Sequence, residues 1–121
     1  MFRIELDQPQ DLLTIRYSGA VTPKETNRCA EEVWVAVTKI KPGFRLLVDL
    51  TGLQSMEVSC APHIRDIMEI CNQNGVAEVV RIIPDPKRDI GLQIMSYFHY
   101  SGDVRITTCL SLAEAVNMLE R

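Results

Sequence analysis

The segment Phe44-Arg45-Leu46-Leu47-Val48-Asp49-Leu50 decides the fold, because it is a nearly continuous apolar run of strand length. Strands with apolar side chains on both faces are typical of sheets that are covered on both sides. The run therefore predicts a strand at the centre of a sheet. The segment from Ala77 to Ile83 has the same character and predicts a second buried strand.

The residues before this strand predict a hairpin and a helix. Apolar and polar side chains alternate over residues 2–7 and 13–18, with a turn at Gln8-Pro9-Gln10-Asp11 between them. Thr22-Pro23-Lys24-Glu25 has the pattern of a capping box, and Pro42-Gly43 ends the helix that begins there. Trp34 falls on the apolar stripe of this helix, so we expect it in the core.

The rest of the chain alternates between helices and strands. A loop over residues 51–58 leads to a second helix that stops at Asn74-Gly75. A third helix is expected from Asp85-Pro86 to about His99, followed by a strand over residues 104–108. Ser111-Leu112-Ala113-Glu114 predicts a capping box at the last helix.

The predicted order β-β-α-β-α-β-α-β-α indicates an α/β protein. Its sheet is mixed and mostly parallel, with covering helices and one antiparallel strand from the hairpin. A length of 121 residues suits one domain over residues 1–121. The usable surface of such a sheet lies beyond the carboxyl ends of its strands, at residues 50–60, 84–88 and 108–111.

Composition excludes several classes of function. The net charge of −3 comes without a long run of either sign, which disfavours binding to nucleic acid or anionic lipid. The four cysteines form no Cys-x-x-Cys pair and have no histidine at ligand spacing, so no metal and no cofactor are expected. An even count would suit two disulfides, but a chain this apolar does not need them, so we expect buried thiols in a reducing cytoplasm. No signal peptide or membrane-spanning segment is recognised, so membrane insertion is not expected.

Motifs for catalysis are also missing from the sequence. It contains no glycine-rich phosphate loop, no Gly-x-Ser-x-Gly elbow and no His-Glu-x-x-His. Cys60 near a helix start, with His63 three residues later, leaves a thiol enzyme as a weak alternative. A buried cysteine beside a surface histidine explains the same pair, and no catalytic residue is assigned.

Ser59 stands at the start of the second helix and has two interpretations. It is a plain N-cap, or it is a phosphate acceptor that faces the unpaired N–H groups of the helix end. The helix end attracts a charge by only about 0.3–1 kcal/mol, too little to drive a conformational change. The effect of a phosphate would therefore fall on a partner.

The element order, Leu46 to Leu53 and Glu57-Val58-Ser59-Cys60 resemble the STAS domain of bacterial anti-sigma factor antagonists. Members read approximately Val-Leu-Asp-Leu-Ser-Gly-Val and then Asp-Ser-Ser-Gly-Leu. The resemblance implies that Asp49 is the structural aspartate at the strand end and that Ser59 is the phosphoserine. It also implies a protein partner, either an anti-sigma factor or a kinase-like regulator, and leaves a homodimer open.

The match has departures that bear on the phosphate acceptor. Glu57 replaces the aspartate of the motif, Val58 replaces its first serine, and Cys60-Ala61 replaces Gly-Leu. The carboxylate of Glu57 would repel an incoming phosphate. Segments 18–22 and 111–116 also resemble a STAS-like subgroup without the serine motif, whose function is poorly defined.

Two functions follow from these residues. The first is a non-enzymatic regulatory module that docks a protein partner through residues 56–63, with the docking residues Met56, Glu57, Val58, Cys60 and His63. The second is a carrier of a lipid or nucleotide, with a pocket beneath the loops at 84–88 and 108–111. Lys87 and Arg88 at a helix start are candidates for anion binding, although basic residues in an exposed first turn are ordinary and a solvated surface is the preferred interpretation.

Overall fold

Five strands form one sheet in the order β1-β2-β3-β4-β5. The computed structural model describes residues 1–85 and 99–120. The strands are β1 (Phe2–Asp7), β2 (Leu12–Val21), β3 (Arg45–Met56), β4 (Glu78–Ile82) and β5 (Arg105–Cys109). β1 is antiparallel to β2, and every other neighbouring pair is parallel. The predicted mixed α/β sheet, its hairpin and its central strand are confirmed.

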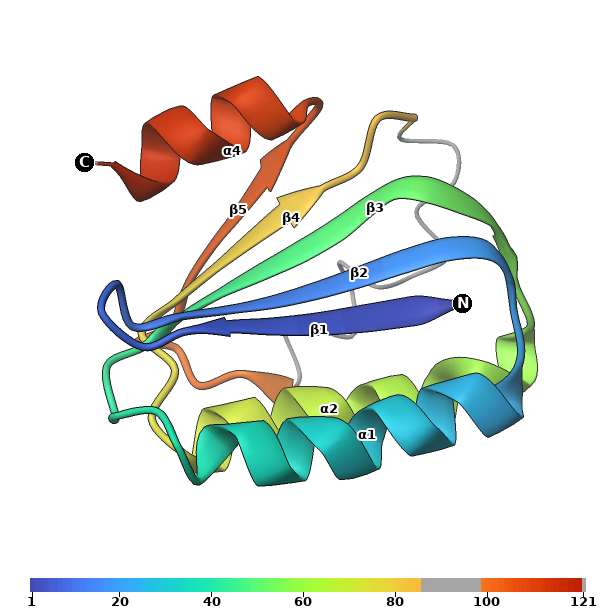
Figure 1. The fold of residues 1–121 in the computed structure, drawn as a ribbon, viewed down its shortest axis with the longest axis horizontal. Coiled ribbons are helices and arrows are strands. Elements are labelled where there is room, and N and C mark those ends of the chain that lie inside the picture. Colours follow the sequence, from blue (N-terminus) through green and yellow to red (C-terminus); the bar gives the residue numbers. More distant parts are fainter. Residues whose placement is uncertain (86–98, 121) are drawn as a thin grey trace.

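Helices cover both faces of this sheet. α1 (Pro23–Val37) and α2 (Ala61–Gln73) lie side by side on one face, and α4 (Leu112–Leu119) lies on the other face near β4 and β5 (Figure 1). A short 3-10 helix, η1 (Val58–Cys60), joins β3 to α2. The helix predicted from residue 85 to about 99 lies largely outside the described residues, together with Lys87 and Arg88.

The two-sided covering explains the apolar run in β3. Leu46 packs into the core beneath α1 and α2, whereas the next residue, Leu47, packs into the smaller core beneath α4. Val79 and Val80 of β4 divide in the same way. Successive side chains of a strand point to opposite faces, so a strand between two helix layers must be apolar at consecutive positions.

The start of α1 has the predicted capping box. The Thr22 side chain accepts a hydrogen bond from the Glu25 backbone N–H, and the Glu25 carboxylate accepts one from the Thr22 N–H. At α4 only the serine half matches the prediction, since Ser111 accepts from the Glu114 N–H. The Glu114 carboxylate accepts from the N–H of Leu110, one residue before the cap.

The prediction of a loop over residues 51–58 was wrong, because β3 continues to Met56. The second half of β2 extends the pairing, from Ser18 opposite Gly52 to Val21 opposite Met56. Two register shifts interrupt this ladder and break the alternation that marks a strand in a sequence.

The prediction of a buried Trp34 was also wrong, since its side chain is 58% exposed. Val33 and Val37 occupy the face of α1 that meets the core. Trp34 follows Val33 by one residue, which is about 100° around the helix, so it points away from the core.

Candidate functional site

The turn between β3 and α2 carries the most exposed large apolar residue in the part of the chain that the structure describes. Val58 is 90% exposed, and its neighbours Glu57 and Ser59 are exposed as well. We call these three residues the 57–59 turn. The Cys60 N–H donates to the Glu57 carbonyl at 2.9 Å, which closes the turn onto itself.

Buried residues hold the turn at both ends. Met56 before it is 8% exposed, and Cys60 after it is fully buried. The Glu57 N–H donates to the Val21 carbonyl at 3.4 Å, and the Cys60 thiol lies 3.7 Å from the same oxygen. Because Met56 and Cys60 face the core, they anchor the turn and leave the surface to the other docking residues.

Ser59 is not the N-cap of α2, which corrects one of the two interpretations from the sequence. Cys60 takes the cap position and makes no side-chain cap hydrogen bond. The Ala61 N–H donates to the Val58 carbonyl, and Pro62 has no N–H. Few N–H groups are therefore left for a phosphate on Ser59, whose charge would stay on the surface beside Glu57.

His63 lies in the first turn of α2, where the sequence placed it, and is half-buried. It follows Ser59 by four residues. Together with the 57–59 turn it defines the surface at the start of α2. The other histidine of the chain, His99, lies 3.3 Å from Glu69 near the opposite end of the helix.

Asp49 fixes the point where β3 leaves β4. The pairing of these strands ends at Asp49 opposite Ile82, although β3 continues beside β2. The Asp49 carboxylate accepts hydrogen bonds from the Thr51 N–H at 2.9 Å and from the Thr51 hydroxyl at 2.5 Å. It also accepts from Arg16 at 3.2 Å. These bonds support a structural role at the point where the strands separate.

Comparisons with known proteins identify the fold. No protein-family model matches the chain, and no curated protein does. Solved structures match over nearly the whole chain. An uncharacterised DUF3478-family protein from Shewanella loihica, with a SpoIIAA-like fold, has a TM-score of 0.73 at 15% identity, covering 98% of this chain and 93% of that one. The chain has the SpoIIAA-like fold.

Two anti-sigma factor antagonists share it. SpoIIAA in its unphosphorylated form has a TM-score of 0.66 at 13% identity, covering 99% of this chain and 98% of that chain. An antagonist from Mycobacterium paratuberculosis has a TM-score of 0.62 at 12% identity, covering 100% and 96%. The STAS-like fold expected from the resemblance is thereby confirmed.

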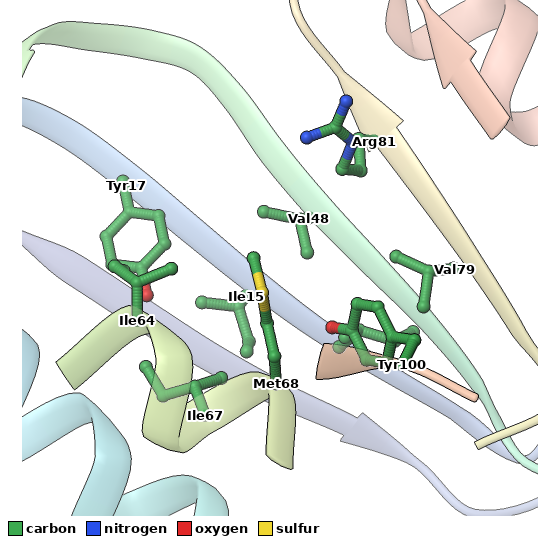
Figure 2. A pocket seen from close by; sticks show the side chains of 10 residues that line it. Ile15, Tyr17, Val48, Ile64, Ile67, Met68, Val79, Arg81 and Tyr100 are labelled. Atoms are coloured by element: carbon green, nitrogen blue, oxygen red, sulfur yellow. The ribbon is translucent and has the colours of Figure 1, made fainter. Parts of the chain in front are cut away.

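Two cavities of this SpoIIAA-like fold bear on the carrier hypothesis. Figure 2 shows one between the sheet and α2, lined mainly by apolar side chains that include Ile15, Val48 and Met68; its volume is about 30 Å³. The other, about 50 Å³, lies at the carboxyl ends of β3 and β4 beside Pro84. Ligand pockets usually measure roughly 300–1,000 Å³, so neither has room for a lipid or a nucleotide.

Arg81 is a buried residue that the sequence analysis did not single out. It lines the cavity in Figure 2 at its β4 side, is 2% exposed and donates to the Thr108 hydroxyl at 3.1 Å. The sequence does mark this position, because Arg81 interrupts the apolar run of a strand that is predicted to be covered on both faces. Charged residues are rarely buried without partners, so an arginine in such a run indicates a buried polar contact.

The thiols of the chain are free and buried, as predicted from its apolar composition. Burial raises the pKa of Cys29 to about 11 and that of Cys71 to about 12. Reactive cysteines have lowered pKa values and partial exposure. Cys60 is fully buried and points to Val21, which disfavours the thiol-enzyme alternative.

The described residues form neither a metal site nor a membrane-spanning helix. They contain no group of three or more histidine, cysteine or acidic side chains that would hold a metal ion. Their helices are also too short or too polar to cross a membrane.

Proposed function

We propose that this chain is a non-enzymatic regulatory module that docks a protein partner through the 57–59 turn and His63. The exposure of Val58 carries the proposal. Single apolar residues on a surface are ordinary, but this one stands on a turn whose two ends are fixed in the core. Burying a valine side chain in an interface contributes about 1.5–3 kcal/mol.

The fold supports the same function. Solved structures that match this chain are described as anti-sigma factor antagonists, and SpoIIAA is known in phosphorylated and unphosphorylated forms. By this likeness the partner is an anti-sigma factor or a kinase-like regulator in the bacterial cytoplasm. Within the described residues, which leave out most of the loop at 84–88, the two enclosed cavities are too small for a lipid or a nucleotide, so we favour docking over the carrier.

We further propose that phosphorylation of Ser59 regulates this docking. Its hydroxyl lies on an exposed turn, so a kinase can reach it without unfolding the chain. A phosphate adds a charge of about −1.5 to −2 beside Glu57 and next to the apolar Val58. Left unpaired in an interface, it would cost several kcal/mol, and about 2.8 kcal/mol already weakens binding a hundredfold.

Cross-linking tests the docking surface. Val58 is replaced by a photoreactive phenylalanine and irradiated in native lysate, with the same replacement at the exposed Leu112 of α4 as the matched control. We expect one discrete adduct from position 58 and none of the same mass from position 112. Val58→Asp should then weaken binding of that protein at least about tenfold while the circular dichroism spectrum is unchanged. Unchanged affinity would contradict the docking proposal.

The switch is tested separately from the docking. Incubation with the serine kinases of the source organism, followed by mass spectrometry, should place a phosphate on Ser59. Ser59→Asp should weaken partner binding, and Ser59→Ala should retain it. Equal binding of both variants and the wild type would rule out the switch and leave the docking surface intact.

A further inference from the structure

A groove runs between α1 and α2 on the side that faces away from the sheet. Its volume is about 570 Å³, and the apolar part of its lining comes from Ala30, Trp34, Val35 and Ile70. Trp34 is 58% exposed and Val35 is 52% exposed. A tryptophan open to solvent beside apolar neighbours is typical of a binding surface, because its large ring is usually buried.

The same groove is strongly acidic. Among the described residues Glu31, Asp66 and Glu69 line it, and no lysine or arginine does. Glu31 and Asp66 form no ion pair with any residue in the described part of the chain. Glu69 lies 3.3 Å from the His99 ring, which carries a charge only when it is protonated.

The two helices add to the negative potential. α1 and α2 run in the same direction from the end where β2 and β3 finish, so their carboxyl ends meet at the far end of the groove (Figure 1). The carboxyl end of each helix carries about half a negative charge, and the last turn of neither helix contains a basic residue. Lys39, just beyond α1, lines a separate groove beside β1.

We propose that the groove between α1 and α2 binds a basic, arginine-bearing segment of a protein partner. A guanidinium group stacks on a tryptophan face and pairs with carboxylates at the same time. The groove offers both, with Trp34 flanked by Glu31 and with Asp66 on the opposite helix. The apolar stems of arginine side chains suit Val35 and Ile70.

Two other occupants fit the charges less well. In a two-fold dimer built on this face the acidic groove would meet itself, and like charges across an interface are unfavourable. An anionic lipid surface would be repelled for the same reason. The groove is also separate from the 57–59 turn, since it follows the later turns of the helices, so the two sites can be tested independently.

Trp34 is the only tryptophan of the chain, so its fluorescence reports directly on the groove. The probe is a synthetic amphipathic peptide with arginines on one face and leucines on the other, and its partner is the same peptide with citrulline in place of arginine. We expect the arginine peptide to shift Trp34 emission at micromolar concentration and the citrulline peptide to bind much more weakly. Added salt should weaken the binding.

Variants locate the binding in the groove. Glu31→Gln combined with Asp66→Asn should weaken binding of the arginine peptide at least about fivefold. Glu120→Gln at the end of α4 should leave the affinity for this peptide unchanged. Calorimetry, which does not depend on the fluorophore, should show loss of binding for Trp34→Ala and partial retention for Trp34→Phe.

Several results would overturn the proposal. These are an unchanged emission up to about 1 mM peptide, equal binding of the citrulline peptide, or equal weakening by the Glu120 control. Trp34 emission that changes with protein concentration in the absence of peptide, together with a dimer in sedimentation, would assign the groove to a second copy of the chain. A shift with anionic vesicles alone would assign it to a membrane.

Discussion

Alkaline pH should destabilise this fold through two buried thiols. Cys29 in α1 and Cys71 in α2 are completely inaccessible to solvent. Burial raises their pKa values from 9.0 to about 11 for Cys29 and to about 12 for Cys71. The native state therefore keeps both protons over a range of pH in which the unfolded chain loses them, and we expect the free energy of unfolding to fall above about pH 9.

The sign and size of the effect follow from the linkage between protonation and folding. A group whose pKa is raised by folding contributes its full stability below its unfolded pKa and loses it as the pH approaches the folded value. One pKa unit corresponds to 1.36 kcal/mol, so ionisation of Cys29 in the unfolded chain lowers the free energy of unfolding by about 2 kcal/mol by pH 11. With Cys71 the slope between about pH 10 and 11 is roughly 2 kcal/mol per pH unit. Small domains have only about 5–15 kcal/mol in total.

Urea unfolding followed by circular dichroism measures this slope from about pH 8 to pH 10.5. Cys29→Ala should reduce the slope by about half, while its packing cost appears equally at every pH. Buried Tyr17 and Tyr100 also have raised pKa values, because burial disfavours their ionised forms, and they steepen the loss above pH 10. A free energy that stays flat through pH 10.5, or a Cys29→Ala variant with the full slope, would refute the reasoning.

Three further predictions concern the capping box, the glycines and the thiols. Thr22→Ala removes the hydroxyl that accepts the Glu25 N–H and should cost about 1 kcal/mol in urea unfolding; no loss would mean that the cap is dispensable. Gly75→Ala should destabilise more than Gly19→Ala, because both have positive φ but a Cβ at Gly75 would lie 2.9 Å from Pro42; equal losses in thermal unfolding would contradict this. A thiol reagent should modify the four cysteines slowly in the native state and rapidly in urea, and fast native labelling would show that they are accessible.

Features with a local cause were predictable from the sequence. The capping box at Thr22 needs only residues within one turn of helix, and the hairpin needs only alternation around a turn. The central strand was also predictable, since two apolar faces on one strand require a layer on each side. These signals define the SpoIIAA-like element order without any knowledge of distant contacts.

Features that depend on distant contacts were not predictable. The second half of β3 is held by β2, and it contains Gly52, a residue type that is depleted in strands. The apolar stripe of α1 is wider than the face that the core accepts, so the position of Trp34 depended on how the helix is rotated. Ser59 would be the N-cap only if α2 began directly after it. The 3-10 helix moves the start of α2 to Ala61.

The extension of β3 also determines where the proposed docking surface lies. Beyond Asp49 the strand has left β4 and follows β2 toward the starts of α1 and α2 (Figure 1). The 57–59 turn is therefore set apart from the crevice at the carboxyl ends of β3 and β4, where ligands usually bind in such sheets. Because Val21 and Met56 pair at the end of this ladder, the placement of Val58 depends on the register of β2 and β3 rather than on the turn alone. A Cβ at Gly52 would lie 3.2 Å from the Ser18 side chain, closer than ordinary van der Waals contact, so Gly52→Ala would press on this ladder without changing any residue of the turn.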